Sequence, residues 1–168
     1  MNTEYLPTLT KESENPFGVQ SVLNDYRMVM ISRHASLTVR KEVFMGKAKF
    51  GIYGDGKELA QVAMARFFKL GDFRSGYYRD QTLLFAMQEL SLQEYFAQLY
   101  AHTDTKVEPA SGGRLMNGHF ATRSLNDDGT WKNLMEMRNS SADVSPTAAQ
   151  MPKLLGLAYA SKLYKENP

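Results

Sequence analysis

The stretch GDFRSGYYRDQ, residues 71–81, places Tyr77, Tyr78 and Arg79 directly behind a glycine turn. A tyrosine packed in a hydrophobic core would explain either aromatic residue, but an arginine is rarely fully buried unless it has a partner. The question is therefore which anion or polar group Arg79 faces. A surface ion pair with Asp80 is one answer. The other is an anion clamp, in which the planar guanidinium of Arg79 and the hydroxyl of Tyr78 both donate hydrogen bonds.

Helical patterns precede this stretch. Over residues 19–44, apolar residues such as Val22 and Tyr26 recur at intervals of three, four or seven with charged residues between them, which predicts one long amphipathic helix or two. The segment KELAQVAMARFF, residues 57–68, predicts a further helix. Residues 1–18 contain prolines and show no sustained period, so we expect an N-terminal arm there.

Two short helices are expected over residues 81–101. Ser91 and Glu94 have the spacing of a capping box. Leu90 and Tyr95 occupy the positions of a hydrophobic staple on either side of it. The second of these helices should therefore begin at Ser91.

The segment from residue 103 to 144 is rich in Gly, Asn, Asp and Ser, and a loop of this length in a compact domain is usually functional or mobile. Within GGRLMNGHF, residues 112–120, His119 is surrounded by glycine and polar backbone and is a candidate pocket residue. Ser145 and Pro146 then predict the start of another helix, with Ser145 as N-cap and Pro146 in the first turn. Its free N–H groups would suit an anion or a polar ligand, although an ordinary helix cap is the alternative.

Composition narrows the class of protein. With 168 residues, 43% of them hydrophobic, the chain is long enough for one domain with a sizeable core. A net charge of +2 without a basic run argues against a nucleic-acid partner. The lack of cysteine excludes disulfides, thiolate metal sites and a cysteine nucleophile, and it agrees with a cytoplasmic protein. No apolar stretch predicts a membrane span or a signal peptide.

Several common motifs are incomplete or absent. GIYGDGKEL, residues 51–59, lacks the third glycine of a dinucleotide fingerprint, and no convincing strand precedes it, so a glycine turn at the start of a helix is the preferred interpretation. His34, His102 and His119 lie too far apart for a local metal-binding spacing, and no metal ligand is assigned. Neither a Gly-x-Ser-x-Gly elbow nor a P-loop occurs.

Four segments in order carry a resemblance to a known family: GDGKELAQVA, GDFRSGYYRDQ, GGRLMNGHF and SPTAAQMPKLLGLAYASKLY. Together they resemble the alpha part of the thiamin-diphosphate-dependent 2-oxo-acid dehydrogenases, the decarboxylating component, and above all the bacterial type that fuses alpha and beta parts in one chain. The resemblance covers about residues 20–165. It implies an α/β thiamin-diphosphate-binding fold, of which residues 19–168 form the N-terminal, mostly helical section with few short strands.

The resemblance also implies roles for individual residues. Tyr78 and Arg79 match the Tyr-Arg pair that reaches the diphosphate of thiamin diphosphate in the family. Ser145 and Thr147 match the residues near the aminopyrimidine end of the cofactor, where backbone atoms make most of the contacts. His119 lines the same region, and no catalytic step is assigned to it.

The family binds magnesium, and some members also bind potassium; the sequence has different implications for the two ions. Some members hold potassium with hydroxyl-bearing residues near the Ser-Pro pair, but Val144 and Ala149 stand at two of those positions here, although Gln150 is retained. The family's magnesium motif, a Gly-Asp-Gly with a later asparagine, is expected beyond residue 168. Residues 19–168 are therefore expected to be a truncated piece of the cofactor domain.

The implied activity is decarboxylation of a 2-oxo acid, branched-chain or pyruvate, with transfer of the acyl group to lipoamide. The implied partners are the beta part of the same enzyme and a lipoyl acyltransferase, within an oligomer. A fragment of a fused protein and a separate alpha subunit are both compatible with the sequence. The alternative from another class is a non-catalytic helical interaction module, or an inactive fragment, derived from such an enzyme.

Overall fold

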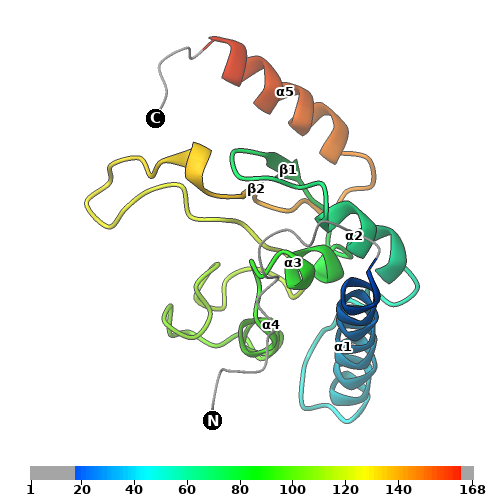
Figure 1. The fold of residues 1–168 in the computed structure, drawn as a ribbon. Coiled ribbons are helices and arrows are strands. Elements are labelled where there is room, and N and C mark those ends of the chain that lie inside the picture. Colours follow the sequence, from blue (N-terminus) through cyan, green and yellow to red (C-terminus); the bar gives the residue numbers. More distant parts are fainter. Residues whose placement is uncertain (1–17, 164–168) are drawn as a thin grey trace.

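The computed structural model describes residues 18–163 and contains five α-helices, one short 3-10 helix and two strands within that range (Figure 1). Apart from Gly18, the arm predicted for residues 1–18 lies outside the described residues. In chain order the elements are α1 (Val19–Phe44), α2 (Glu58–Ala65), β1 (Phe73–Ser75), α3 (Gln81–Ala86), α4 (Leu92–Leu99), η1 (Leu134–Glu136), β2 (Asn139–Ser141) and α5 (Gln150–Leu163). This mixture of helices and a small parallel sheet agrees with the predicted α/β class.

The core lies where α3 meets α1, α2 and α4. All six residues of α3 are buried, because the helix is enclosed by its neighbours. Val39 of α1 and Tyr95 of α4 are completely buried in the same cluster. The ring of Tyr95 packs edge-on against Phe85, with 5.5 Å between centroids. Apolar side chains from α1, α3 and α4 thus form one cluster, and Met28, Val62 and Ala86 form a second, smaller cluster between α1, α2 and α3.

The sequence predicts one helix or two over residues 19–44, and these residues form the single helix α1. The face of α1 that is buried differs from the expected face. Val22 and Tyr26, which carried the apolar pattern, are 52% and 61% exposed. The buried stripe instead includes Ser32 and Ser36, whose hydroxyls bond to α3 side chains. Small polar residues let α1 and α3 approach closely while their hydroxyl groups remain satisfied.

The helix predicted at Ser91 is confirmed as α4. Ser91 Oγ accepts from the backbone N–H of Glu94 (3.1 Å), and the Glu94 carboxylate accepts from the backbone N–H of Ser91 (2.8 Å). Leu90 and Tyr95 are both buried in the core. The capping box and the neighbouring apolar pair therefore set the start of α4.

The glycine turn expected before the second helix is also confirmed. Gly56 has a φ of +92°, which favours glycine, and its N–H donates to the Glu58 carboxylate at 2.9 Å. Gly54 lies against the side chain of Gln81, which an added Cβ would meet at 2.4 Å. The GDG segment is thus a tightly packed turn that leads into α2.

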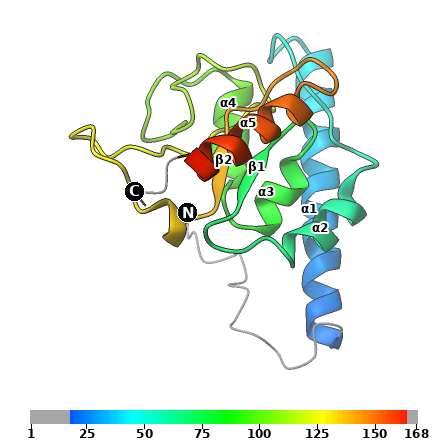
Figure 2. The same ribbon diagram turned by 90° about the horizontal axis from the view of Figure 1, so that it is seen from above.

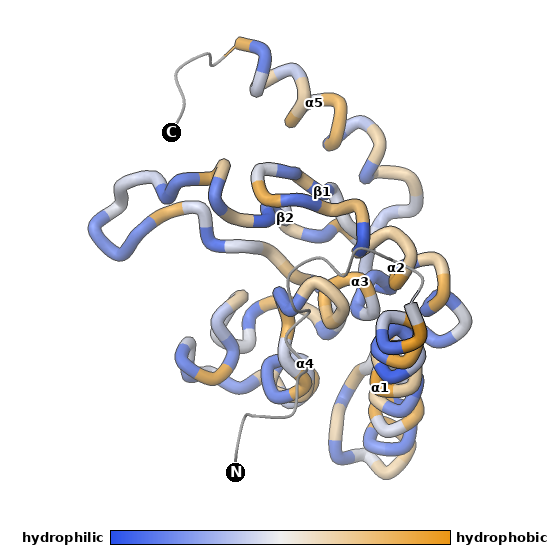
Figure 3. Tube along the Cα trace, in the orientation of Figure 1, coloured by the Kyte–Doolittle hydropathy of each residue, from blue (hydrophilic) through white to orange (hydrophobic). Residues whose placement is uncertain are grey.

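Strands β1 and β2 pair in parallel, with Phe73 opposite Asn139 and Ser75 opposite Ser141. Helix α5 lies over this small sheet, on the side away from α3 and α4, in both views (Figures 1 and 2). Hydrophobic positions recur along α5 (Figure 3), although none of its residues is buried. No helix among the described residues is both long and apolar enough to cross a membrane.

The predicted start of the last helix at Ser145 is wrong. Residues 146–149 form a turn, Ala148 has a φ of +68°, and α5 begins at Gln150. Pro152 explains the difference, because a proline inside a helix has no N–H to donate and its ring clashes with the carbonyl four residues earlier. With α5 starting at Gln150, Pro152 falls in the first turn, where neither penalty applies.

Candidate anion-binding site

The structure brings the sequence-predicted site residues together from three separate segments. Tyr78 and Arg79 lie in the turn between β1 and α3, His119 lies in the loop before β2, and Ser145 and Thr147 lie in the turn between β2 and α5. His119 Nε2 is 2.6 Å from Ser145 Oγ. The rings of Tyr78 and His119 have centroids 6.0 Å apart. These five residues are called the candidate site below.

Arg79 does not pair with its neighbour Asp80. Asp80 accepts from Arg74 Nη1 at 3.1 Å and from the backbone N–H of Tyr77 at 2.8 Å. The Arg79 side chain is exposed and lies over the ring of Tyr78, with 5.3 Å from the guanidinium carbon to the ring centroid. Among the described residues, no carboxylate forms an ion pair with Arg79. The surface-pair interpretation is therefore wrong, and the guanidinium faces solvent.

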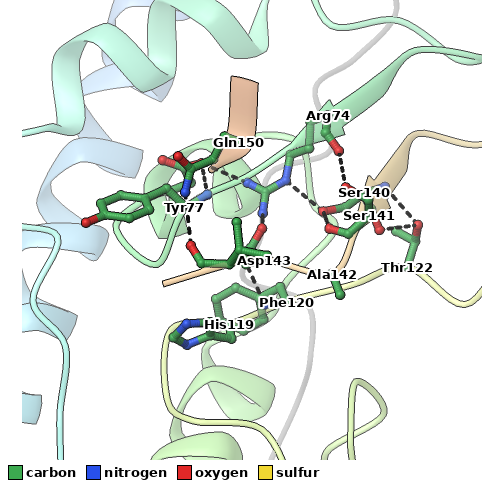
Figure 4. Close-up of polar contacts among 12 residues, drawn as sticks. Arg74, Tyr77, His119, Phe120, Thr122, Ser140, Ser141, Ala142, Asp143 and Gln150 are labelled. Atoms are coloured by element: carbon green, nitrogen blue, oxygen red, sulfur yellow. Dashed lines mark hydrogen bonds and ion pairs between the residues drawn. The ribbon is translucent and has the colours of Figure 1, made fainter. Parts of the chain in front are cut away.

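A buried ion pair joins Arg74 to Asp143, and Figure 4 shows it near Tyr77 and His119. The side chain of Arg74 is 6% exposed and that of Asp143 is 0% exposed. Arg74 Nε also donates to Ser140 Oγ at 2.8 Å. Gly76 packs against this pair, since an added Cβ would lie 2.2 Å from both the Arg74 guanidinium carbon and Asp143 Oδ1. The glycine before Tyr77 is thus required by packing.

Asp143 connects the ion pair to the loop that carries His119. Its second carboxylate oxygen accepts from the Phe120 N–H at 3.0 Å, and its own N–H donates to the Phe120 carbonyl at 2.9 Å. Burial raises the pKa of Asp143 to about 6, against the lowering effect of the Arg74 guanidinium. Arg74, Asp80 and Asp143 therefore hold all three site segments in register.

His119 is 5% exposed, and both of its ring nitrogens face protein groups. Nδ1 lies 3.2 Å from the carbonyl oxygen of Met116, which can only accept, so Nδ1 carries a proton. In the neutral imidazole, Nε2 then accepts from the Ser145 hydroxyl. His119 thus orients Ser145 and presents no free ring nitrogen to a ligand.

Gly118 allows the His119 loop to approach the Tyr78 backbone. Its φ is +82°, and an added Cβ would meet the Tyr78 carbonyl oxygen at 2.8 Å. Gln98 of α4 holds this loop in place, because its side chain accepts from the Gly118 N–H at 2.7 Å and donates to the His119 carbonyl. The loop is therefore anchored from the helical core.

The donor set fits a diphosphate. Arg79 supplies a guanidinium without a carboxylate partner among residues 18–163, and Tyr78 supplies a hydroxyl group beside it. The hydroxyl groups of Ser145 and Thr147 are engaged by His119 and Tyr77. Within residues 18–163, no group of three or more His, Asp or Glu side chains could hold a metal ion. The magnesium ligands expected beyond residue 168 lie outside the described range. At the position where some family members hold potassium, Gln150 Nε2 donates to the Val144 carbonyl at 3.0 Å.

Three residues of this region escape prediction from the sequence. Tyr77 suits a core position by its type, whereas its hydroxyl lies 2.5 Å from that of Tyr78 and 3.4 Å from Thr147 Oγ1. Arg74 and Asp143 are missed because nothing in the local pattern marks a pair that is 69 positions apart. A charged residue inside the β1 strand is the one available signal.

Comparison with known proteins finds a distant relative. No family model matches the chain. Over 151 residues the chain is 28% identical to the 2-oxoisovalerate dehydrogenase subunit alpha of Bacillus subtilis (strain 168), and the match covers 88% of this chain and 40% of the relative. The chain thus spans about two fifths of that protein's length. The match supports a distant relationship to the 2-oxo-acid dehydrogenases.

Proposed function

We propose that the chain is part of a thiamin-diphosphate-dependent 2-oxo-acid dehydrogenase, and that the candidate site binds the diphosphate of the cofactor. The observation that carries this proposal is the exposed guanidinium of Arg79, which has no carboxylate partner among residues 18–163 and lies beside Tyr78 where two other site segments meet. The distant relationship to a 2-oxo-acid dehydrogenase alpha subunit supports it independently.

In the proposed enzyme, the residues of this chain bind the cofactor and orient it. Arg79 and Tyr78 donate hydrogen bonds to phosphate oxygens, and the Arg79 charge is available because Asp80 is already occupied by Arg74. Ser145, held by His119, and Thr147 approach the other end of the cofactor. When bound, thiamin diphosphate would supply the nucleophilic carbon on which a 2-oxo acid is decarboxylated. Magnesium would be held by residues outside positions 18–163.

The proposed substrate is a branched-chain 2-oxo acid, since the relative is named for 2-oxoisovalerate; pyruvate is the alternative. The proposed partners are a beta part and a lipoyl acyltransferase that receives the acyl group on lipoamide. An assembly of this kind would also cover the apolar side chains of α5, such as Met151 and Leu155, which are 73% and 71% exposed.

The second candidate is a non-catalytic interaction module. The same exposed apolar residues of α5 favour it, because an apolar helix with no buried residue needs a partner whether or not the chain binds a cofactor. The two candidates differ in one measurable property, which is affinity for thiamin diphosphate.

Isothermal titration calorimetry of the complete enzyme that contains this chain, with thiamin diphosphate and magnesium, tests the proposal. We expect binding by the wild type, and a loss of about 10- to 100-fold in affinity in Arg79→Ala, the range for a hydrogen bond to a charged group. Arg27→Ala is the matched control, because Arg27 is an exposed arginine on α1 outside the candidate site. Equal affinities of the wild type and Arg79→Ala would remove Arg79 from the site. No binding by the wild type would favour the interaction module.

A further inference from the structure

Three hydroxyl groups form a chain across the candidate site. Tyr77 donates its phenol proton to the Tyr78 oxygen at 2.5 Å. The Tyr77 oxygen also lies 3.4 Å from Thr147 Oγ1. A phenol has one proton, and that of Tyr77 is already used, so Thr147 is the donor in the second bond. The bonds therefore run in one direction, from Thr147 through Tyr77 to Tyr78.

The last group in this chain keeps a free proton. Tyr78 accepts from Tyr77, so its own proton remains available for an acceptor outside the chain. A tyrosine phenol ordinarily has a pKa of about 10, so the proton stays on Tyr78 at neutral pH. Hydrogen bonds in series also polarise one another, which strengthens the terminal donor.

The chain is held at both ends by the fold. The rings of Tyr77 and Tyr78 pack against each other, with centroids 3.8 Å apart and planes tilted by 38°. The backbone N–H of Tyr77 is fixed by Asp80, which in turn pairs with Arg74. Thr147 comes from the turn between β2 and α5, so the chain joins residues 70 positions apart.

We propose that Tyr77 and Thr147 are positioning residues that direct the Tyr78 hydroxyl proton to an oxygen of the diphosphate. This inference rests on the proposed function and deepens it. Tyr78 then acts as a committed donor beside the Arg79 guanidinium, which is the arrangement that two neighbouring phosphoryl oxygens require. A ligand that offers hydrogen-bond donors at this point would find no partner in Tyr78.

Calorimetric titration of the complete enzyme with thiamin diphosphate and magnesium, as wild type, Tyr77→Phe, Tyr78→Phe and the double variant, tests the hydroxyl chain. Phenylalanine keeps the packed rings and removes only the hydroxyl groups. We expect a loss of affinity of about 10- to 100-fold for Tyr78→Phe and about 3- to 10-fold for Tyr77→Phe. In the Tyr78→Phe background, Tyr77→Phe should have no further effect, because it acts through the Tyr78 proton.

Thr147 provides the conservative pair of variants. Thr147→Val removes the hydroxyl at nearly constant shape and should weaken binding by about 2- to 5-fold, whereas Thr147→Ser should restore wild-type affinity. Thermal unfolding of each variant gives the control. If Thr147 had only a structural role, its replacement would lower the unfolding midpoint whether or not the Tyr78 hydroxyl is present.

The outcomes separate the two proposals. A wild type that does not bind overturns the proposed function. If the wild type binds, two results would overturn the hydroxyl chain and leave the proposed function standing. In one, Tyr77→Phe binds as tightly as the wild type. In the other, Tyr77→Phe lowers the affinity equally with and without the Tyr78 hydroxyl. A Thr147→Ser variant as weak as Thr147→Val removes Thr147 from the chain.

Discussion

Two glycine turns in this molecule each precede a helix, and they differ in which arginines pair with the acidic residues nearby. In the turn before α2, Asp55 pairs with Arg40 of α1 at 3.0 Å, and Glu58, the first residue of α2, pairs with Arg33 of α1 at 2.6 Å. The charges of Asp55 and Glu58 are thus each matched by an arginine within the fold. Both of these arginines are engaged, whereas the exposed Lys57 of the α2 turn forms no ion pair within residues 18–163.

In the turn before α3, the acids are assigned to another arginine. Asp80 and Asp143 both pair with the buried Arg74, and the exposed Arg79 receives neither. The comparison teaches that the pairing of acids, rather than glycine spacing, decides whether an arginine near a glycine turn stays exposed to a ligand. Four predictions test this difference, in order of decreasing effect.

Removing the buried cation should have the largest effect. Arg74→Met leaves Asp143 without its partner in a site closed to solvent, and we expect a loss of about 3–5 kcal/mol in the free energy of unfolding. Chemical denaturation monitored by circular dichroism measures it. Arg40→Met, which affects the α2 turn, is the control and should cost far less, because its pair with Asp55 is partly exposed. Equal losses would contradict the comparison.

Replacing the glycine of each turn, Gly76 or Gly54, by alanine should lower the stability by different amounts. Gly76→Ala would press a methyl group against the paired guanidinium and carboxylate, neither of which can move without breaking the pair, so we expect a cost of about 1–3 kcal/mol. Gly54→Ala would meet the end of the Gln81 side chain, whose amide can shift, so its cost should be smaller. Thermal melts of both variants decide the order, and a larger drop for Gly54→Ala would refute the explanation.

Stability should depend on pH through Asp143. Its pKa of about 6 in the fold lies above the ordinary value of 3.8, so the folded state holds a proton that the unfolded state has lost between these pH values. Stability from this group is therefore greatest below pH 4 and falls as the pH rises to about 6. Asp143→Asn keeps an acceptor for Phe120 and should flatten this slope. Parallel slopes for the two proteins, measured by thermal melts from pH 4 to 7, would exclude Asp143 as the cause.

The smallest effect is expected at the surface pair of the α2 turn. Asp55→Asn removes one partner of Arg40 where both side chains reach solvent, which should cost about 0.2–1 kcal/mol. Affinity for thiamin diphosphate should not change, because the pair of Arg40 and Asp55 lies outside the candidate site. A change in affinity, measured by calorimetry, would show that the α2 turn and the α3 turn are coupled.

Most of the helical half could be predicted from the sequence because its signals are local. The capping box of Ser91 and Glu94 spans three residues, and the pattern before residue 44 repeats along one helix. The last helix is predicted too early because Pro146 and Pro152 both suit a first helical turn, and the positive φ of Ala148 decides between them.

The candidate site could be predicted only in part. Resemblance to a family points to Tyr78, Arg79, Ser145 and Thr147, and the structure brings their segments together. Some of the contacts that hold them in place join residues 66 to 70 positions apart, as in the pair of Arg74 and Ser140 or the contact of Tyr77 with Thr147. Contacts of this length leave no periodic or local pattern in a single sequence.

The sequence separation of Arg74 and Asp143 also affects the order in which parts of the structure can form. Contacts between distant segments form late, because a long loop must close before they contribute. Helix α4, whose cap joins residues three apart, can form well before β2 meets β1. During synthesis at about 5–20 residues per second, Arg74 precedes Asp143, 69 positions later, by roughly 3–14 s. A nascent chain in that interval carries a cation in β1 without its buried partner, so the site forms only after the loop and β2 have been made.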